Sequence, residues 1–229
     1  MKIFEVDPEH PDHELVSEIV ALLKKGAVIA YPTDTLYALG GDAFNKELNH
    51  RIRILKGREG TKPLPHIIDE AERLAQWRIR LSPPAAVIAA KFWPGPVSIV
   101  VKGSSALPAE VLDSRKTICV RVPDCRIARS LAGGVSGLLV ATSANPSGQP
   151  PARTAHEAAE YFRGEIDAVV DGGPSASELP STIVDVSGRQ TVILREGALR
   201  SERIKAVIAM IENQPDTNEG AENETRHSV

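Results

Sequence analysis

Apolar residues near the start of the chain recur with the spacing of one helix face. In DHELVSEIVALLKK, residues 12–25, Leu15, Ile19 and Leu22 stand at positions i, i+4 and i+7, which lie on one side of an α-helix. Asp12 is a suitable N-cap, and a glycine follows the closing lysines. The short apolar run AVIAY follows this glycine and precedes a proline, so it favours a buried strand.

The same patterns predict elements along the rest of the chain. Helical spacing predicts helices at about 46–56, 69–77, 83–92, 125–132, 154–163 and 202–212. Short β-branched runs predict strands at 97–102, 117–122, 138–142, 168–171, 182–186 and 191–195. Because helices and strands mix without a clean β-α-β order after residue 95, we predict an α/β domain with a mixed sheet.

The end of the chain departs from these patterns. Residues 213–229, NQPDTNEGAENETRHSV, are polar and acidic and show no periodicity, which is typical of a disordered tail. The preceding residues contain neither an internal repeat nor a linker. We therefore predict one domain over residues 1–212.

The charge distribution adds a cationic segment to this picture. The 229 residues are 42% hydrophobic and 25% charged, as in ordinary globular proteins. Residues 214–229 hold four of the 30 acids and one of the 27 bases, so the rest of the chain carries 26 of each. Within residues 51–62, one acid, Glu59, stands among Arg51, Arg53, Lys56, Arg58 and Lys62. Such a segment suits an anion such as phosphate, although on charge alone a solvated basic helix end is the commoner explanation.

Several classes of protein are disfavoured. No apolar run approaches the roughly 20 residues that cross a bilayer, and we expect a cytoplasmic protein. The two cysteines, Cys119 and Cys125, fit neither a zinc knuckle nor a redox pair, and are predicted to be reduced thiols in or near the core. The six histidines match no metal or nucleophile motif, so surface or capping roles are predicted for them and no metal site.

Loops after several predicted strands share small hydroxyls, glycines and prolines. They are PTDT (32–35), GREGTKP (57–63), TSANPSG (142–148), DGGPSASELPST (171–182) and REG (195–197). Backbone amides and hydroxyls in such loops can hold anionic oxygens. Neither GxxxxGK[ST] nor GxGxxG occurs, so a nucleotide would require another kind of site.

Two short pairs of polar residues stand out within these loops. Ser143 and Asn145 would share one face of an extended chain, although composition alone slightly favours a simple turn in which Ser143 bonds the backbone. Lys56 and Arg58 flank a glycine at a predicted helix end, and a mobile point charge beside a planar fork suits a polyphosphate. Without a convincing nucleophile and base, these features indicate an electrostatic site.

Seven segments, taken in order, carry a family resemblance: YPTDTLYALGGDA, LKGREGTKPLP, FWPGPVSIVV, VRVPD, ATSANPSGQPP, STIVDV and ILREGAL. Over about residues 12–200 the sequence resembles the YrdC/TsaC family of threonylcarbamoyl-AMP synthases. The family signatures KxR and SxN appear as Lys56-Gly-Arg58 and Ser143-Ala-Asn145. An ordered set of segments is far more specific than a lone motif.

The resemblance implies a fold and a reaction. A twisted mixed sheet with helices would surround a large cationic cavity that binds ATP with Mg²⁺, L-threonine and bicarbonate. Threonine's amine would capture bicarbonate or CO₂ as a carbamate, whose oxygen would attack the α-phosphorus of ATP and release pyrophosphate. The product would be threonylcarbamoyl-AMP, which partner transferases would use on an adenosine of transfer RNA. The chain resembles the short, single-domain form of the family.

The resemblance also implies residue roles. Polyphosphate would be held by Lys56, Arg58 and Lys62, with Ser143 and Asn145 on phosphate oxygens or the metal. Thr117 and Arg195 would contact the nucleotide, and Thr35, Arg121 and Ser181 the threonine. The hydroxyls of residues 32–35 would line the amino-acid pocket, and Gly40 and Gly41 would let backbone approach it.

Each role competes with a structural one. Asp34 could cap a turn, Arg121 could form a structural ion pair, Ser181 could start a strand, and Trp93 is expected in the core rather than against adenine.

Glu59 and Ala38 depart from the family's usual proline and glycine at these positions, which leaves open a paralogue with another substrate. An RNA-binding module is a second alternative, against which the neutral body and 4% aromatic content argue. Carbamoyl transfer in metal-centre maturation is a third, but the zinc-finger modules found there would need more cysteines.

Overall fold

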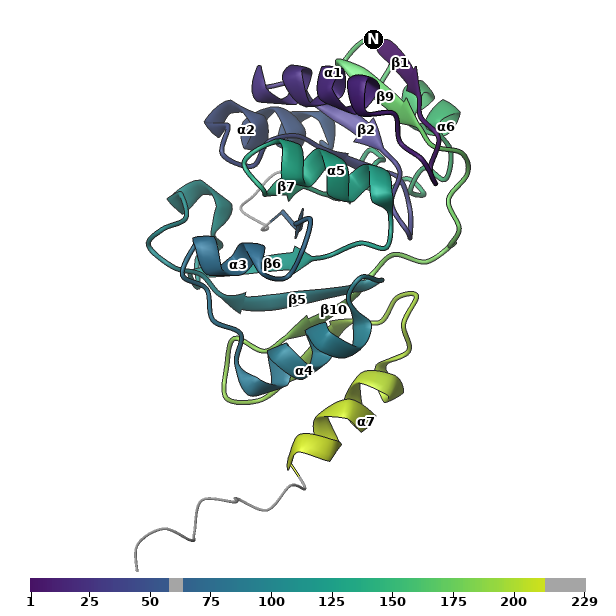
Figure 1. Cartoon of the computed structure of the whole chain (residues 1–229). Helices are drawn as coiled ribbons and strands as arrows, with labels where there is room; N and C mark the ends of the chain where they lie inside the picture. Colours follow the sequence, from purple (N-terminus) through teal and green to yellow (C-terminus); the bar gives the residue numbers. More distant parts are fainter. Residues whose placement is uncertain (58–63, 213–229) are drawn as a thin grey trace, which may run out of the picture.

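The computed structural model describes residues 1–57 and 64–212, and Figure 1 shows their arrangement. Arg58, Glu59, Lys62 and the predicted tail lie outside the described residues. The helices and strands form two stacked regions, each built on one sheet (Figure 1). The expected mixed α/β architecture is therefore confirmed, with its strands divided between two sheets rather than gathered in one.

Both sheets combine parallel and antiparallel neighbours. The first has the order β1-β9-β2-β3-β8, where β1 is parallel to β9 and β2 is antiparallel to β3. Its strands are β1 (Lys2–Glu5), β2 (Ile29–Tyr31), β3 (Ala38–Gly40), β8 (Thr142–Ser143) and β9 (Ala168–Asp171). The second has the order β11-β10-β5-β6-β4-β7, where β10 is parallel to β5 and β5 is antiparallel to β6. Its strands are β4 (His66–Ile67), β5 (Val97–Lys102), β6 (Thr117–Arg121), β7 (Leu139–Val140), β10 (Thr182–Asp185) and β11 (Val192–Arg195).

Helices lie on both faces of the first sheet and beside the second (Figure 1). They are α1 (His13–Lys24), α2 (Lys46–Leu55), α3 (Arg73–Gln76), α4 (Pro83–Phe92), the 3₁₀ turn η1 (Ala109–Val111), α5 (Arg126–Gly134), α6 (Ala155–Tyr161) and α7 (Ser201–Glu212). Asp12 caps α1 as predicted, because its carboxylate accepts from the amide of Leu15 at 2.9 Å. The helix predicted over 69–77 was too long, since α3 is a single turn. None of the described helices has the length and apolar character that crossing a bilayer requires.

A five-residue segment, Leu139–Ser143, joins the two sheets. Its first part, β7, pairs with β4 of the second sheet, and its last part, β8, pairs with β3 of the first. Between them, the amide of Val140 donates to the carbonyl of Gly41 in the first sheet at 2.9 Å. The next amide, of Ala141, donates to the carbonyl of Pro65 on the other side at 2.8 Å. The segment therefore fixes the spacing of the sheets.

The paired glycines belong to this junction. A Cβ atom on Gly40 would lie 1.6 Å from the carbonyl oxygen of Val140, and one on Gly41 would lie 2.6 Å from that of Ala27. Such distances exclude any side chain at either position. The glycines let strands approach one another, and neither lines the cavity described below. The expectation that they admit backbone to a ligand pocket was wrong.

Candidate functional site

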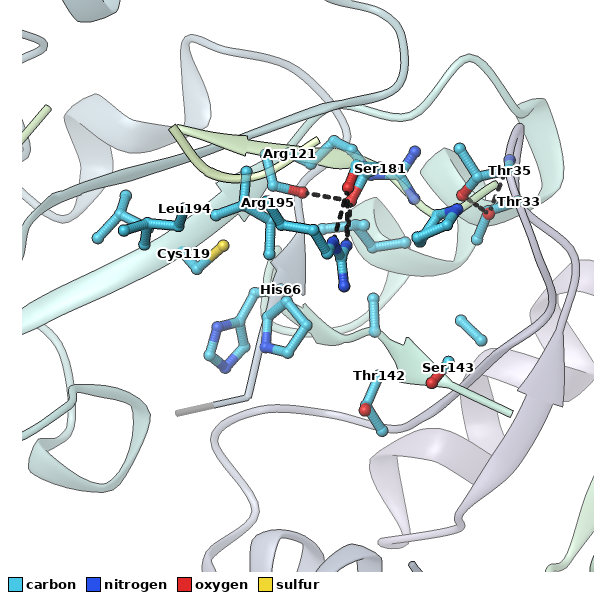
Figure 2. A pocket seen from close by; sticks show the side chains of 18 of the residues that line it. Thr33, Thr35, His66, Cys119, Arg121, Thr142, Ser143, Ser181, Leu194 and Arg195 are labelled. Atoms are coloured by element: carbon cyan, nitrogen blue, oxygen red, sulfur yellow. Dashed lines mark hydrogen bonds between the residues drawn. The ribbon is translucent and has the colours of Figure 1, made fainter. Parts of the chain in front are cut away.

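A cavity of about 320 Å³ lies between the sheets and is lined by the 32–35 loop and strands of both sheets. Along β6, Arg121, Cys119 and Thr117 all line it, because alternate residues of a strand share one face. Two parts of the cavity differ in composition (Figure 2). We call Thr33, Thr35, Arg121, Ser143, Ser181 and Arg195 the arginine end. We call Pro65, His66, Val100, Cys119 and Leu194 the histidine end.

The PTDT loop presents an ordered pair of hydroxyls at the arginine end. Thr33 Oγ1 donates to the carbonyl of Leu36 at 2.7 Å and lies 3.0 Å from Thr35 Oγ1. Since the Thr33 proton is used by Leu36, Thr35 must donate within the pair. The lone pairs of Thr35 Oγ1 are then available as acceptors, which suits an ammonium or amine. Both threonines are buried.

Arg121 and Asp34 form a buried ion pair beside these hydroxyls. Arg121 Nη1 donates to Asp34 Oδ1 at 2.5 Å, and the two side chains are 7% and 10% exposed. Arg121 thus forms the structural ion pair that was considered as the alternative to a binding role. Asp34 is the partner in this pair rather than the cap of a turn. The other guanidinium nitrogens, Nε and Nη2, make no hydrogen bond to described residues. They can donate to a carboxylate or phosphate while the ion pair persists.

Arg195 extends from β11 over Ser181. Its Nε and Nη2 atoms donate to the carbonyl of Ser181 at 3.1 and 2.7 Å, and Nη2 also contacts the Ser181 hydroxyl at 3.2 Å. Burial lowers the pKa of Arg195, and the nearby Arg121 acts in the same direction. No carboxylate pairs with Arg195 within residues 1–57 and 64–212. Figure 2 shows it pointing into the cavity, where it favours an anion.

Lys56 joins the two predicted signature pairs. Its side chain is 1% exposed, and Nζ donates to the carbonyls of Ser143 and Asn145 at 2.5 and 2.8 Å. Nζ also lies 3.1 Å from Asn145 Oδ1, which accepts from the Ser143 hydroxyl at 2.6 Å. Ser143 and Asn145 therefore converge as predicted. Ser143 lines the cavity, whereas Lys56 and Asn145 are not part of its lining. The hydrogen bonds of Lys56 instead hold the loop that carries Ser143 and Asn145.

Thr117 lies farther along β6, where a carboxylate accepts hydrogen bonds from both its amide and its hydroxyl. Asp113 accepts from the amide of Thr117 at 2.7 Å and from its hydroxyl at 2.8 Å. Arg115, which is 57% exposed, contacts both Asp113 and Asp185. These bonds lower the pKa of Asp113 against the opposing effect of burial. Thr117 and Asp113 both line the cavity.

The histidine end was missed by the sequence-based predictions. His66 is 2% exposed, and neither ring nitrogen has a hydrogen-bond partner in the described part of the chain. Burial lowers the pKa of His66 to about 4. The nearby backbone of Cys119 offsets part of this effect, although its distance and angle do not meet the criteria for a hydrogen bond. The surface or capping role predicted for this histidine was wrong. Its place in the apolar string PLPHII was the one available signal.

The structure brings most predicted site residues together. Thr35, Thr117, Arg121, Ser143, Ser181 and Arg195 line one cavity. Both cysteines are unpaired thiols, as predicted, and Cys119 also lines the cavity. Ala38, a departure from the family pattern, lines the cavity as well. The described residues contain no group of three or more histidine, cysteine or acidic side chains placed to hold a metal ion.

The fold is that of an α/β protein whose two mixed sheets enclose a cavity lined by arginines and hydroxyls, a composition that suits an anion. Residues 21–197 match the family model described as "Telomere recombination", which represents the Sua5, YciO and YrdC proteins. The chain belongs to this family. The resemblance drawn from the ordered sequence segments is thereby confirmed.

Known relatives share this family membership. A threonylcarbamoyl-AMP synthase of Pyrococcus abyssi (strain GE5 / Orsay) is 35% identical over 193 residues, 84% of this chain and 57% of that protein. Another, of Thiobacillus denitrificans, is 40% identical over 167 residues, 73% of this chain and 88% of the relative. The crystal structure of P. abyssi Sua5 complexed with L-threonine gives a TM-score of 0.85 at 33% identity, covering 91% of this chain and 61% of that one. The chain thus spans little more than half of the Pyrococcus protein.

Proposed function

We propose that this protein is a threonylcarbamoyl-AMP synthase, a nucleotidyltransferase that uses L-threonine, bicarbonate or CO₂, and ATP. The observation that carries the proposal is the arginine end, where two guanidinium groups and several oriented hydroxyls meet in one cavity. Relatives of up to 40% identity bear the name of this activity. A structural neighbour was crystallised with L-threonine.

Threonine fits the arginine end by the chemistry of its two charged groups. Its carboxylate would accept from the Nε and Nη2 groups of Arg121, and its amine would face the acceptor Thr35 Oγ1. Ser181, whose hydroxyl lies 3.2 Å from Arg195 Nη2, would contact the same ligand. These contacts would hold the amine in position for reaction. The charge of Asp34 would remain neutralised by its ion pair with Arg121.

The proposed reaction transfers the AMP group. The threonine amine adds to CO₂ and loses a proton, and a carbamate oxygen then attacks the α-phosphorus of ATP. The bond from that phosphorus to the bridging oxygen breaks, and pyrophosphate leaves with the electron pair. ATP would enter as its Mg²⁺ complex, so the metal is part of the substrate. In-line displacement of this kind depends mainly on positioning and charge neutralisation.

Phosphate contacts would come from several elements. Arg195 and Ser143 line the cavity and would contact phosphate oxygens. Lys56 and Asn145 would act by holding the Ser143 loop, as their hydrogen bonds indicate. By family resemblance, Arg58 and Lys62 would add further positive charge.

The product would be a mixed anhydride that must be passed on quickly. Threonylcarbamoyl transferases would carry the group to an adenosine of transfer RNA, which this chain need not bind tightly. The cytoplasm, where ATP and transfer RNA occur, would be the site of the reaction.

Pyrophosphate release from Mg·ATP and bicarbonate tests the proposal, measured with and without L-threonine. We expect threonine-dependent release, reduced about tenfold or more in Ser143→Ala and Lys56→Ala. Arg163→Ala, at an exposed position whose partner is Glu160, is the matched control and should keep the parent rate.

Other outcomes would point elsewhere. A folded parent chain that releases no pyrophosphate would overturn the synthase assignment. Release that depends on another amino acid would favour a paralogue with a different substrate. Salt-sensitive RNA binding tighter than ATP binding would favour an RNA-binding module.

A further inference from the structure

We propose that Thr182 and Glu196 are positioning residues for Arg195, acting through the turn that joins β11 to α7. We call residues 195–199, with the sequence REGAL, the REGAL turn. The inference rests on the proposed function in taking a polyphosphate as the ligand of Arg195. Neither Thr182 nor Glu196 lines the cavity, so any effect on a ligand would pass through their neighbours.

The hydroxyl of Thr182 binds the REGAL turn at two places. Its Oγ1 atom accepts from the amide of Gly197 at 2.9 Å and donates to the carbonyl of Leu199 at 2.5 Å. Thr182 has no exposed surface, so removing the hydroxyl would leave a buried amide and a buried carbonyl without a partner. The hydroxyl therefore holds the turn against the first residue of β10.

Gly197 allows the turn to lie this close to β10. A Cβ atom on Gly197 would lie 2.1 Å from the carbonyl oxygen of Pro180, which excludes any side chain at this position. The same carbonyl accepts from the amide of Ala198 at 2.8 Å. The backbone of the REGAL turn is thus bonded to both Pro180 and Thr182.

Arg195 is held at both of its ends by this same segment. Its backbone begins the REGAL turn, and its Nε and Nη2 atoms donate to the carbonyl of Ser181 at 3.1 and 2.7 Å (Figure 2). Nη1 makes no hydrogen bond among the described residues, so it is available to a phosphate. Because a planar guanidinium recognises phosphate through directional hydrogen bonds, a shift of the turn would weaken that recognition. Thr182 can thus influence phosphate binding without touching the ligand.

Glu196 extends this support to α7. Its Oε2 atom accepts from the amide of Ser201 at 2.9 Å and also from the Ser201 hydroxyl. The helix in turn packs against α4, with Ile204 and Ile208 buried. Glu196 thereby couples the docking of α7 to the position of Arg195.

Calorimetry with inorganic tripolyphosphate tests the role of Thr182, because this probe carries phosphate charges without base or sugar. We expect Thr182→Val, which keeps the shape and removes the hydroxyl, to weaken binding about tenfold. Thr182→Ser keeps the hydroxyl and should bind within about twofold of the parent. Ser104→Ala is the matched control, because this hydroxyl also accepts one bond, from Ala106, and donates one, to Trp77, outside the cavity lining. It should leave binding unchanged.

A double-mutant cycle separates positioning from a general loss of structure. Arg195→Ala should weaken tripolyphosphate binding by itself. If Thr182 acts through Arg195, adding Thr182→Val to this variant should cause no further loss. Additive losses, or unchanged binding in either single variant, would overturn the inference.

Glu196→Ala provides a test that leaves buried groups intact, since Glu196 is exposed. Loss of a negative charge beside Arg195 would by itself tighten the binding of an anion, whereas a loosened turn would weaken it. We expect the loosened turn to dominate, with binding about threefold weaker. Unchanged or tighter binding would overturn the role of Glu196.

These binding measurements need neither threonine nor turnover. A protein that shows the coupling but releases no pyrophosphate would refute the synthase proposal and leave the positioning roles standing. Threonine-dependent release, together with unchanged tripolyphosphate binding in Thr182→Val, would refute the positioning role of Thr182 alone.

Discussion

The two ends of the cavity differ in how their polar groups are satisfied. At the arginine end, Arg121 pairs with Asp34, Arg195 contacts Ser181, and the threonine hydroxyls bond one another. At the histidine end, the ring nitrogens of His66 have no hydrogen-bond partner among the described residues. One end is held in place by the protein's own bonds, whereas the other contains polar atoms that these bonds leave unsatisfied.

This difference has separate consequences for the two ends of the cavity. Groups oriented by neighbouring residues do not reorganise when charge shifts at a reacting centre, which favours transition-state stabilisation. A buried titratable group without a partner instead makes stability depend on its protonation state. We therefore expect substitutions at the arginine end to affect stability and rate, and those at the histidine end to affect the pH dependence of stability.

The largest expected effect is at the buried ion pair. Arg121→Ala would leave the Asp34 carboxylate buried without its cation and should lower the free energy of unfolding by about 4 kcal/mol. Urea denaturation measures this. Arg163→Ala, which removes an exposed pair with Glu160, should cost less than about 1 kcal/mol. Equal losses in the two variants would show that the arginine end is not held by this pair.

Acid should destabilise the protein through the histidine end. The folded-state pKa of His66, about 4, lies below the ordinary 6.5, so the unfolded chain binds a proton more readily between these values. The contribution of neutral His66 to the free energy of unfolding is therefore complete above pH 6.5, and it falls by about 3 kcal/mol as the pH drops to 4. Urea denaturation of the parent and of His66→Phe across this range isolates the effect. A parallel pH dependence in the two proteins would contradict it.

Lys56→Met should have a smaller effect on stability. Methionine keeps the apolar stem but leaves the carbonyls of Ser143 and Asn145 without the ammonium donor, at a cost of about 2 kcal/mol. Thermal denaturation reports the loss, and Lys91→Met at an exposed helix position is the control. If the two variants melt together, Lys56 does not hold the loop.

The smallest expected effect concerns the threonine pair. Thr33→Val removes the hydrogen bond to Leu36 and the partner of Thr35, and should cost about 1 kcal/mol of stability. The KM for L-threonine should rise, since Thr35 loses its fixed orientation, while the KM for ATP stays unchanged. A rise confined to the KM for ATP would contradict the placement of threonine against Thr35.

Local signals predicted much of the fold. The helix α1 was predicted closely because its cap and its apolar spacing both lie within the segment itself. Strands β1, β3 and β4 were missed, since two to four residues are too few to show alternation. The division into two sheets depends on pairings between distant segments, such as β3 with β8.

The site was predictable only as far as its geometry was local. Ser143 and Asn145 converge through local hydrogen bonds, in which the Asn145 amide donates to the Ser143 carbonyl at 3.0 Å and the Ser143 hydroxyl donates to Asn145 Oδ1 at 2.6 Å. The pairing of Arg121 with Asp34 joins residues 87 positions apart, so composition could not decide between it and a turn cap. Burial of His66 likewise depends on packing between the sheets, and the apolar string PLPHII was the one local sign of it.

Hydrogen exchange within the Leu139–Ser143 segment would measure how the two walls of the cavity open. Adjacent amides, those of Val140 and Ala141, donate to opposite sheets. Their hydrogen-exchange rates therefore record the opening of each wall separately, at neighbouring positions of one segment. If the two amides exchange at one common rate, the walls open as one cooperative unit; if one is faster, that wall alone moves to admit a ligand.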